Sequence, residues 1–255
     1  MKITVRDLTF GYAEQKIHGK YLFNHFNADL DGGESGRPLV ILGTSGCGKT
    51  TLLKILSGLL QPQEGEIHFS GREPSGAVVA SAFMFQEPRL LPWLSVRQNV
   101  SLPLEKQYGK EGAKERAQHF LSLVSLDDKE EAYPSELSGG QAQRVSMARA
   151  FAWPSAALFM DEPFQSLDIP LRIHLMDLCL SLQESDNLSQ KKRLLIAVTH
   201  DPREAVYLGG RIIILGGTGE GVIFDRIVNL SPEERAYGNA AAGELERELI
   251  LHITK

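Results

Sequence analysis

The residue pattern with the clearest chemistry is GTSGCGKTT at residues 43–51, which fits the spacing G-x-x-x-x-G-K-[ST]. An apolar run at residues 38–42 precedes it and an amphipathic run at residues 49–60 follows it, so a buried strand enters the loop and a helix leaves it. In such a loop, successive backbone N–H groups and the positive end of the helix surround an anion. We therefore predict a site for the phosphates of a nucleoside triphosphate, and a chance glycine-rich turn is the competing interpretation.

Each residue type in this loop has a physical role. The glycines let the backbone approach the phosphates and adopt positive φ angles. We expect Lys49 to reach the β- and γ-phosphates and the Thr50 hydroxyl to take one Mg²⁺ position. The residues expected to bind the nucleotide here are Gly43, Thr44, Ser45, Gly46, Cys47, Gly48, Lys49, Thr50 and Thr51.

A pair of carboxylates follows a second apolar run. Residues 156–160 have the composition of a short buried strand, and Asp161 and Glu162 come directly after it. Adjacent residues at the carboxyl end of a strand can both lie beside a neighbouring phosphate loop. We therefore expect Asp161 to hold Mg²⁺ through water and Glu162 to act as the general base in hydrolysis. A solvated acidic loop is the alternative.

Two further polar side chains end predicted strands. His200 follows the run LLIAVT, and Gln86 follows AFMF. A histidine in this place can hydrogen-bond a γ-phosphate or the attacking water, whereas an uncharged amide can ligate Mg²⁺ or water. For a single histidine a structural role is the alternative, and Gln86 taken alone decides nothing.

The stretch LSGGQ at residues 137–141 predicts a second exposed helix N-terminus. Ser138 is suited to cap a helix whose first turn is Gly-Gly-Gln, and such a helix end can bind an anion. If both helix ends touched one nucleotide within a single chain, the intervening helices would have to fold back onto the core. The alternative is that the two helix ends meet across a dimer.

The elements that must position these residues begin with strands. Residues 2–10 and 21–30 alternate in polarity, and residues 66–69 and 77–85 have the composition of further strands. These strands predict an antiparallel sheet beside the phosphate-loop core. Residues 88–152 are helical in character and form a predicted insertion, with helices capped at Ser95, spanning residues 110–126 and opening at Ser138.

The α/β core resumes after this insertion. A second capping box, at residues 231–234, predicts a helical tail that Gly238 and Gly243 interrupt. The other elements expected here are strands at residues 156–160, 194–198, 211–215 and 222–227, a helix at residues 170–182, and a capping box with proline at residues 201–204.

Bulk properties exclude several classes of protein. The chain has 255 residues, 42% of them hydrophobic, and a net charge of −5, so composition gives no sign of a basic, nucleic-acid-binding face. Two cysteines make no disulfide framework, which favours a reducing, cytosolic location. No apolar run approaches the ~18 residues of a membrane span, and the N-terminus has no apolar signal core. Any membrane role is therefore expected to come from a partner.

This sequence resembles the ATP-binding cassette ATPases in four motifs taken together. They are the phosphate loop, LSGGQ, the AQRVSMARA that follows it and, further along, LFMDEP. The resemblance covers residues 2–227. It implies an α/β fold with a P-loop NTPase core, an antiparallel β-subdomain and an inserted helical subdomain. The expected boundaries in this single ATP-binding domain are about 1–87 and 153–230 for the core and β-subdomain, about 88–152 for the helical subdomain, and 231–255 for the tail.

The same resemblance assigns residues and partners. Two cassettes are expected to pair head to tail around two ATP molecules, so that residues 43–51 of one chain face Ser138, Gly139, Gly140 and Gln141 of the other. Tyr12 matches the aromatic residue that stacks on adenine, although a turn tyrosine packed on the sheet is the alternative. Gln86 matches the glutamine that links the γ-phosphate to the membrane partner. His200 matches the switch histidine, and Asp168 ends the Ser-Leu-Asp segment that crosses the dimer interface.

The expected catalytic set is therefore Glu162, His200 and Lys49, with Thr50, Gln86 and Asp161 at Mg²⁺. More narrowly, FQEPRLLPW at residues 85–93 resembles the ATPase subunits of nitrate, sulfonate and taurine importers and of their relatives for thiamine-precursor-like solutes. This resemblance implies a peripheral ATPase on the cytoplasmic face of the membrane. Its implied partners are a second copy of the subunit, a permease and, indirectly, a solute-binding protein, with no nucleic acid.

Two departures and two alternatives accompany this interpretation. Gln165 and Ser166 stand where these importers often have two small residues, and residues 31–38 are long for the approach to the phosphate loop. A cassette ATPase that acts without a permease, on ribosomes, DNA or iron–sulfur assembly, usually has a second cassette or basic extensions, which this sequence lacks. The ATPase of an exporter is the other alternative. A GTP switch is disfavoured because no NKxD tetrapeptide occurs.

Overall fold

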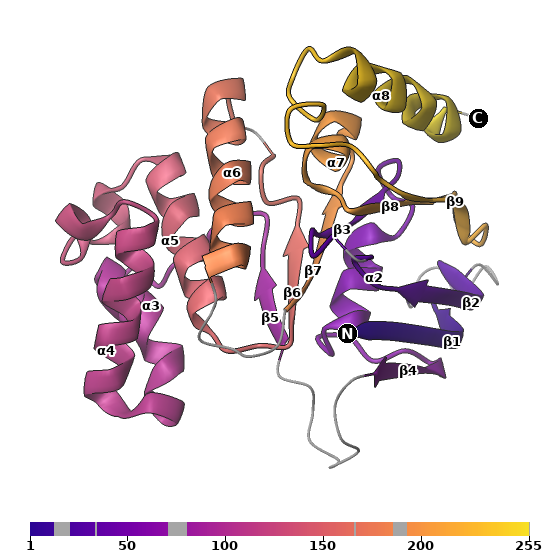
Figure 1. Cartoon of the computed structure of the whole chain (residues 1–255). Helices are drawn as coiled ribbons and strands as arrows, with labels where there is room; N and C mark the ends of the chain where they lie inside the picture. Colours follow the sequence, from indigo (N-terminus) through magenta and orange to yellow (C-terminus); the bar gives the residue numbers. More distant parts are fainter. Residues whose placement is uncertain (13–20, 34, 71–80, 166, 186–192, 255) are drawn as a thin grey trace. The chain divides into compact units, whose positions relative to one another are not determined.

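The computed structural model of the chain describes residues 1–12, 21–33, 35–70, 81–165, 167–185 and 193–254 (Figure 1). The chain divides into two compact units. The first unit comprises Met1–Val79, Phe159–Glu162 and Lys192–Lys255. The second comprises Ala80–Leu158 and Pro163–Lys191.

The first unit contains a small antiparallel sheet with the order β2-β1-β4. Its strands are β1 (Lys2–Phe10), β2 (Phe23–Leu30) and β4 (Glu64–Ser70). In the first half of β1 alternate residues are buried, Ile3 and Val5, as the alternating sequence predicts, whereas Leu8, Thr9 and Phe10 at its end are all buried. The expected strand at residues 2–10 is confirmed, and β4 extends beyond the expected residues 66–69 because its whole length pairs with β1.

The second sheet of this unit positions the phosphate loop. Its central strand β3 (Leu39–Leu42) pairs in parallel with β7 (Leu194–Thr199) and β8 (Arg211–Leu215), while β9 (Val222–Ile227) pairs antiparallel to β8. The order is β6-β7-β3-β8-β9, and β6 (Ala157–Asp161) contributes only its last residues to this unit. All four residues of β3 are fully buried, which explains the unbroken apolar run in its sequence.

Two helices of the first unit pack on this sheet. Helix α2 (Lys49–Leu56) contacts β7, and α7 (Pro202–Leu208) contacts β3 and β7. The expectation that α2 continues to residue 60 is wrong. Gly58 adopts a φ of 79°, and its N–H and that of Leu60 bond back to the carbonyls of Ile55 and Lys54, which ends the helix.

The predicted capping box at residues 201–204 is only half right. Asp201 does cap α7, because its carboxylate accepts the Arg203 N–H at 2.9 Å. The Asp201 N–H, however, donates to the hydroxyl of Thr199 at 3.1 Å, and Glu204 accepts from that same hydroxyl at 2.5 Å. The Thr199 hydroxyl, at the end of β7, thus accepts the Asp201 N–H that the Glu204 carboxylate would accept in a capping box.

The C-terminal helix α8 (Ala240–Ile253) packs against α7 (Figure 1). Ser231 and Glu234 exchange the two hydrogen bonds of a capping box, at 2.8 and 3.3 Å, but they stabilise a turn and not a helix. The expected helix start is therefore wrong, because Gly238 at φ 84° intervenes and Asn239 caps α8 instead. Gly243 lies inside α8 without interrupting it.

In the second unit, four helices cluster together (Figure 1): α3 (Val96–Ser101), α4 (Glu105–Leu123), α5 (Gly139–Ala152) and α6 (Ile169–Ser185). The caps expected at Ser95 and Ser138 are confirmed. Gly109, at φ 69°, marks a kink in α4, so the helix expected from residue 110 is its second segment. Three short 3-10 helices connect these elements, at Leu102–Leu104, Asp127–Lys129 and Pro134–Glu136.

Strand β5 (Ser81–Met84) also belongs to the second unit, where it lies next to β6 in the larger sheet. The expectation that this strand joins the antiparallel sheet is wrong, because a short apolar strand carries no signal of which sheet it enters. The rest of the predicted strand, residues 77–80, lies outside the described residues. Within the described part of the chain, no helix has both the length and the apolar composition needed to cross a membrane.

Candidate functional site

The phosphate loop follows β3 and ends at the first turn of α2, as its sequence predicts. Gly46 and Gly48 adopt φ angles of 84° and 107°, so the loop uses the left-handed backbone that glycine permits. A Cβ at Gly48 would lie 2.8 Å from the Phe23 ring. The backbone therefore turns sharply into α2 while passing close to β2, and a side chain at this position would obstruct it.

Lys49 lies within the curve of this loop. Its ammonium donates to the carbonyl oxygens of Gly43 and Thr44 at 2.8 and 2.9 Å, and the residue is only 5% exposed. A buried cation held by the loop's own carbonyls sets a positive charge among the backbone N–H groups. This is the arrangement that an approaching phosphate requires.

Thr50 and Asp161 form the second part of the site. The Thr50 hydroxyl donates to the Asp161 carboxylate at 2.7 Å, although the two residues are far apart in the sequence. Burial raises the pKa of Asp161 from its ordinary value, partly offset by this hydrogen bond and by the positive charges of Lys54 and Lys49. The two side chains supply a hydroxyl and a carboxylate oxygen, which suit a Mg²⁺ ion that also binds phosphate.

Glu162 and His200 form the third part. The His200 Nδ1 lies 3.0 Å from the Glu162 Oε2, within hydrogen-bonding distance. Glu162 has a φ of 44°, uncommon for a residue other than glycine, and its N–H donates to the Val198 carbonyl at 3.1 Å. Strand β7 thus fixes both members of the pair, the glutamate through its backbone and the histidine by chain continuation.

Tyr12 closes one side of the site. Its hydroxyl lies 3.1 Å from the Thr51 hydroxyl, and its ring packs edge-on against Phe10. The residue nevertheless remains 44% exposed. A cavity of about 350 Å³ lies at this part of the site, and the residues that line it are Tyr12, Leu22, Ser45, Gly46, Gly48, Lys49, Thr50, Thr51 and Glu162.

Comparison with known proteins agrees with this geometry. A family model described as "ABC transporter" matches residues 27–165. The aliphatic sulfonates import ATP-binding protein SsuB of Bacillus cereus is 40% identical over 219 residues, which cover 85% of this chain and 83% of that protein. The Bacillus subtilis protein of the same name is 42% identical over 180 residues, covering 71% of this chain and 68% of its own.

This chain belongs to the ABC transporter family. It is accordingly an ATP-binding, ATP-hydrolysing subunit. Among solved structures, a dimeric post-hydrolysis state of the ATP-binding cassette MJ0796, bound to ADP and Pi, is 29% identical with a TM-score of 0.72. That match covers 90% of this chain and 100% of the solved one.

The remaining residues expected from the ABC resemblance belong to the second unit. Ser138 caps α5, because its hydroxyl accepts the Gln141 N–H at 3.3 Å and the Gln141 side chain accepts the Ser138 N–H at 2.9 Å. Ser138 and Gly139 are exposed, and a Cβ at Gly140 would lie 2.7 Å from the Leu171 side chain. The helix end predicted from LSGGQ is therefore present and accessible.

Asp168 and Gln86 also lie in the second unit. Asp168 is exposed and accepts the Leu171 N–H at 2.9 Å, which places it at the start of α6. The Gln86 amide donates to the side-chain carbonyl of Gln165. Sequence reasoning noted Gln165 as a departure from the resemblance but did not predict this contact with Gln86. Ser166, the neighbouring departure, lies outside the described residues.

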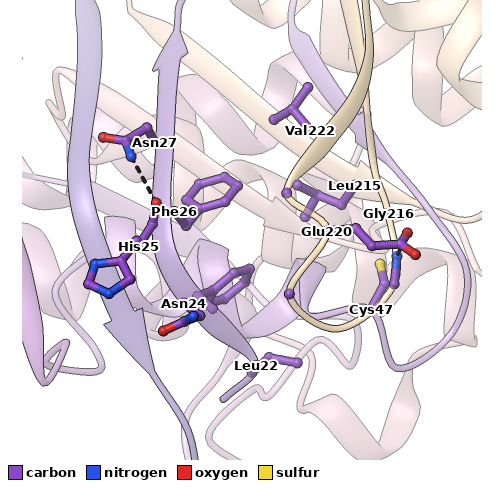
Figure 2. A pocket seen from close by; sticks show the side chains of 14 residues that line it. Leu22, Asn24, His25, Phe26, Asn27, Cys47, Leu215, Gly216, Glu220 and Val222 are labelled. Carbon is purple, nitrogen blue, oxygen red and sulfur yellow. Dashed lines mark hydrogen bonds between the residues drawn. The ribbon is translucent and has the colours of Figure 1, made fainter. Parts of the chain in front are cut away.

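A second cavity, of about 260 Å³, lies behind the loop in the first unit (Figure 2). Cys47 lines it together with β2 residues and the glycine-rich turn before β9. Burial raises the pKa of the Cys47 thiol. Figure 2 also shows Asn27 donating to the His25 carbonyl, at 2.8 Å, on the opposite wall. Sequence reasoning counted Cys47 only as a phosphate-loop residue and did not predict this cavity.

Proposed function

We propose that this chain is the ATPase subunit of an importer for a sulfonate-like solute. The observation that carries the proposal is the 40% identity, over most of both chains, to proteins named as aliphatic sulfonate import ATP-binding subunits. Nitrate, taurine and thiamine-precursor-like molecules are the neighbouring solute classes. The arrangement of Lys49, Glu162 and His200 supports the hydrolytic part of the proposal.

In this proposal the first unit binds and positions ATP. Tyr12 stacks on the adenine, the loop at residues 43–51 surrounds the phosphates, and Lys49 neutralises the β- and γ-phosphates. Glu162 accepts the proton of the attacking water. His200 hydrogen-bonds both the Glu162 carboxylate and the γ-phosphate. These two contacts favour the in-line geometry that phosphoryl transfer requires.

Thr50, Asp161 and Gln86 would hold Mg²⁺ when the nucleotide binds. Bound Mg²⁺ would neutralise charge on the phosphates. Burial of Asp161 disfavours its charged form, so a cation at this carboxylate would offset the cost of desolvation.

The same proposal gives the second unit its role across a dimer. Ser138, Gly139, Gly140 and Gln141 of one subunit complete the ATP site of a second copy, with Asp168 at the interface between them. Support comes from the exposed, capped end of α5 and from the dimeric state of the matched cassette structures. ATP then shifts the population from open to closed dimers, and hydrolysis reverses the shift.

Transport requires membrane partners, since no described helix of this chain can cross a membrane. We propose that a permease binds the subunit at the cytoplasmic face and that a solute-binding protein delivers the solute to the permease. The exposed Trp93, close in sequence to Gln86, offers apolar surface for a short permease helix. We do not favour the permease-independent or exporter alternatives, because the relatives reported above are named as importer subunits.

Affinity capture tests this proposal directly. The tagged Glu162→Gln variant is solubilised with ATP in mild detergent, and the proteins bound to it are identified by mass spectrometry. Co-purification of a multi-span permease and a solute-binding protein is the expected result. A parallel capture with the Ser138→Arg variant controls for dimer-independent binding, and recovery of ribosomal or DNA-bound proteins without a permease would contradict import.

A further inference from the structure

The segment that carries His200 is short. Strand β7 ends at Thr199 and α7 begins at Pro202, so only His200 and Asp201 connect them. The Asp201 carboxylate accepts the Arg203 N–H at 2.9 Å, and the Asp201 carbonyl accepts the Ala205 N–H at 3.2 Å. The position of the imidazole therefore depends on the angle between the strand and the helix on either side of it.

Two buried polar side chains join that strand to that helix. Thr199 and Glu204 are each only 4% exposed. The Thr199 hydroxyl donates to the Glu204 carboxylate at 2.5 Å and accepts the Asp201 N–H at 3.1 Å. The hydroxyl of the residue before His200 thus bonds to two residues after it. It donates to Glu204 and accepts from Asp201.

The hydrogen bond between Thr199 and Glu204 is expected to be a strong link between β7 and α7. A hydroxyl that donates to a buried carboxylate makes a short, charge-assisted hydrogen bond, and the 2.5 Å distance is of that type. Glu204 also lies in the first turn of α7, where the helix dipole stabilises negative charge. A buried carboxylate is expensive unless such partners compensate it. The hydrolysis scheme above assigns no role to this buried carboxylate, which joins α7 to the strand that leads to His200.

We propose that Glu204, acting through Thr199, is a positioning residue for His200. The pair fixes the turn so that the His200 Nδ1 faces the Glu162 Oε2, whose own backbone is anchored to Val198 on the same strand. Loss of the pair leaves the ATP-binding loop intact but lets the imidazole move away from the glutamate. Because this inference rests on the proposed roles of Glu162 and His200, its test must separate the two.

Conservative and disruptive substitutions give matched pairs. Thr199→Ser keeps the hydroxyl, whereas Thr199→Val has nearly the same shape without it. Glu204→Gln keeps an acceptor oxygen, whereas Glu204→Met removes it. We expect Thr199→Val and Glu204→Met to lower kcat for ATP about tenfold with KM changed less than about twofold, since misplacement affects the chemical step and not binding. Thr199→Ser and Glu204→Gln are expected to retain most of the wild-type kcat.

A double-mutant cycle with His200→Ala identifies the route of the effect. If Glu204 and Thr199 act through His200, Thr199→Val changes single-turnover hydrolysis less than about twofold in the His200→Ala background. Equal losses in both backgrounds, or a Thr199→Val enzyme with wild-type kcat, would overturn the inference. Circular dichroism and nucleotide binding show that each variant is folded. A wild-type subunit that does not hydrolyse ATP, or a His200→Ala variant with full activity, would instead contradict the proposed function, and the inference with it.

Discussion

The imidazole Nδ1 of His200 lies 3.0 Å from the carboxylate Oε2 of Glu162. The glutamate side chain is 17% exposed and lines the cavity at the phosphate loop, while the histidine side chain is 47% exposed. A carboxylate that is held by one partner and still accessible can accept a proton from water in a defined direction. Substitutions in this Glu162–His200 pair should therefore change the rate of ATP hydrolysis much more than the affinity for ATP.

The first prediction concerns Glu162→Gln. The substitution keeps the size of the side chain and can keep a hydrogen bond to His200, but it removes the carboxylate that we propose as the proton acceptor. We expect kcat to fall at least about 100-fold while ATP affinity stays within about threefold, because loss of a general base affects the transition state alone. Steady-state hydrolysis and binding of a fluorescent ATP analogue measure the two quantities.

The matched control is Glu244→Gln on the exposed face of α8, which makes the same chemical change away from the site. It should leave both quantities unchanged. A Glu162→Gln enzyme with wild-type turnover would remove Glu162 as the base.

The second prediction concerns the helix end in the second unit. Ser138→Arg places a long cation at the exposed start of α5. We expect hydrolysis to be lost and ATP binding by the monomer to be retained, because in the proposed dimer these residues complete the ATP site of the partner subunit. Light scattering with ATP should show no dimer. Loss of ATP binding as well would indicate that LSGGQ has a structural role in the monomer.

Ser95 offers a control for the loss of a helix cap. It caps α3 with the same pair of hydrogen bonds that Ser138 makes on α5. Ser95→Ala and Ser138→Ala should each cost about 1 kcal/mol in the free energy of unfolding. Only Ser138→Ala should also lower ATPase activity, and equal effects on activity would attribute the role of Ser138 to stability.

The third prediction compares two glycines of the phosphate loop. Gly46 and Gly48 both have positive φ, but a Cβ at Gly46 meets nothing within 4 Å, whereas one at Gly48 lies 2.8 Å from the Phe23 ring. Gly46→Ala should cost about 1 kcal/mol from backbone strain. Gly48→Ala should cost about 1–3 kcal/mol more, from overpacking. Urea unfolding measures both, and equal costs would show that the Phe23 ring moves freely.

Much of the site was predictable because its residues are local in sequence. The loop at residues 43–51 carries its own strand, glycines and helix start, and LSGGQ carries its own cap. Asp161 and Glu162 could be placed because they follow a buried apolar run. The same strand-end argument placed both carboxylates beside the phosphate loop that carries Thr50, and it allowed His200 to reach the γ-phosphate or the attacking water. The hydrogen bonds that join Asp161 to Thr50 and Glu162 to His200 became visible only in the structure.

The predictions that failed depend on contacts that sequence spacing does not encode. Glu204 matched a capping box, yet its carboxylate accepts from the buried Thr199 hydroxyl. Ser231 and Glu234 form the reciprocal bonds of a helix start, but Gly238 at φ 84° turns the chain before α8 begins. Strand β5 joined the larger sheet, because neighbours in a sheet need not be neighbours in sequence. In each case a tertiary partner or a backbone turn prevailed over a local pattern.

The fourth prediction concerns the two thiols, which are both buried and outside any disulfide. Burial raises the pKa of Cys47 above its ordinary 9.0, and full burial raises that of Cys179 to about 12. The thiolate is the reactive form, so raised pKa values leave both residues mostly protonated, and slow to react, at neutral pH.

Cys47 lines the cavity behind the phosphate loop, whereas Cys179 lies within α6. We therefore expect iodoacetamide to modify Cys47 first, at a rate that keeps increasing beyond pH 9. Cys179 should react only when urea unfolds the protein, and mass spectrometry of a time course from pH 7 to 10 distinguishes the two. Modification of Cys179 at the rate of Cys47 in the folded protein would contradict the burial that the structure assigns to it.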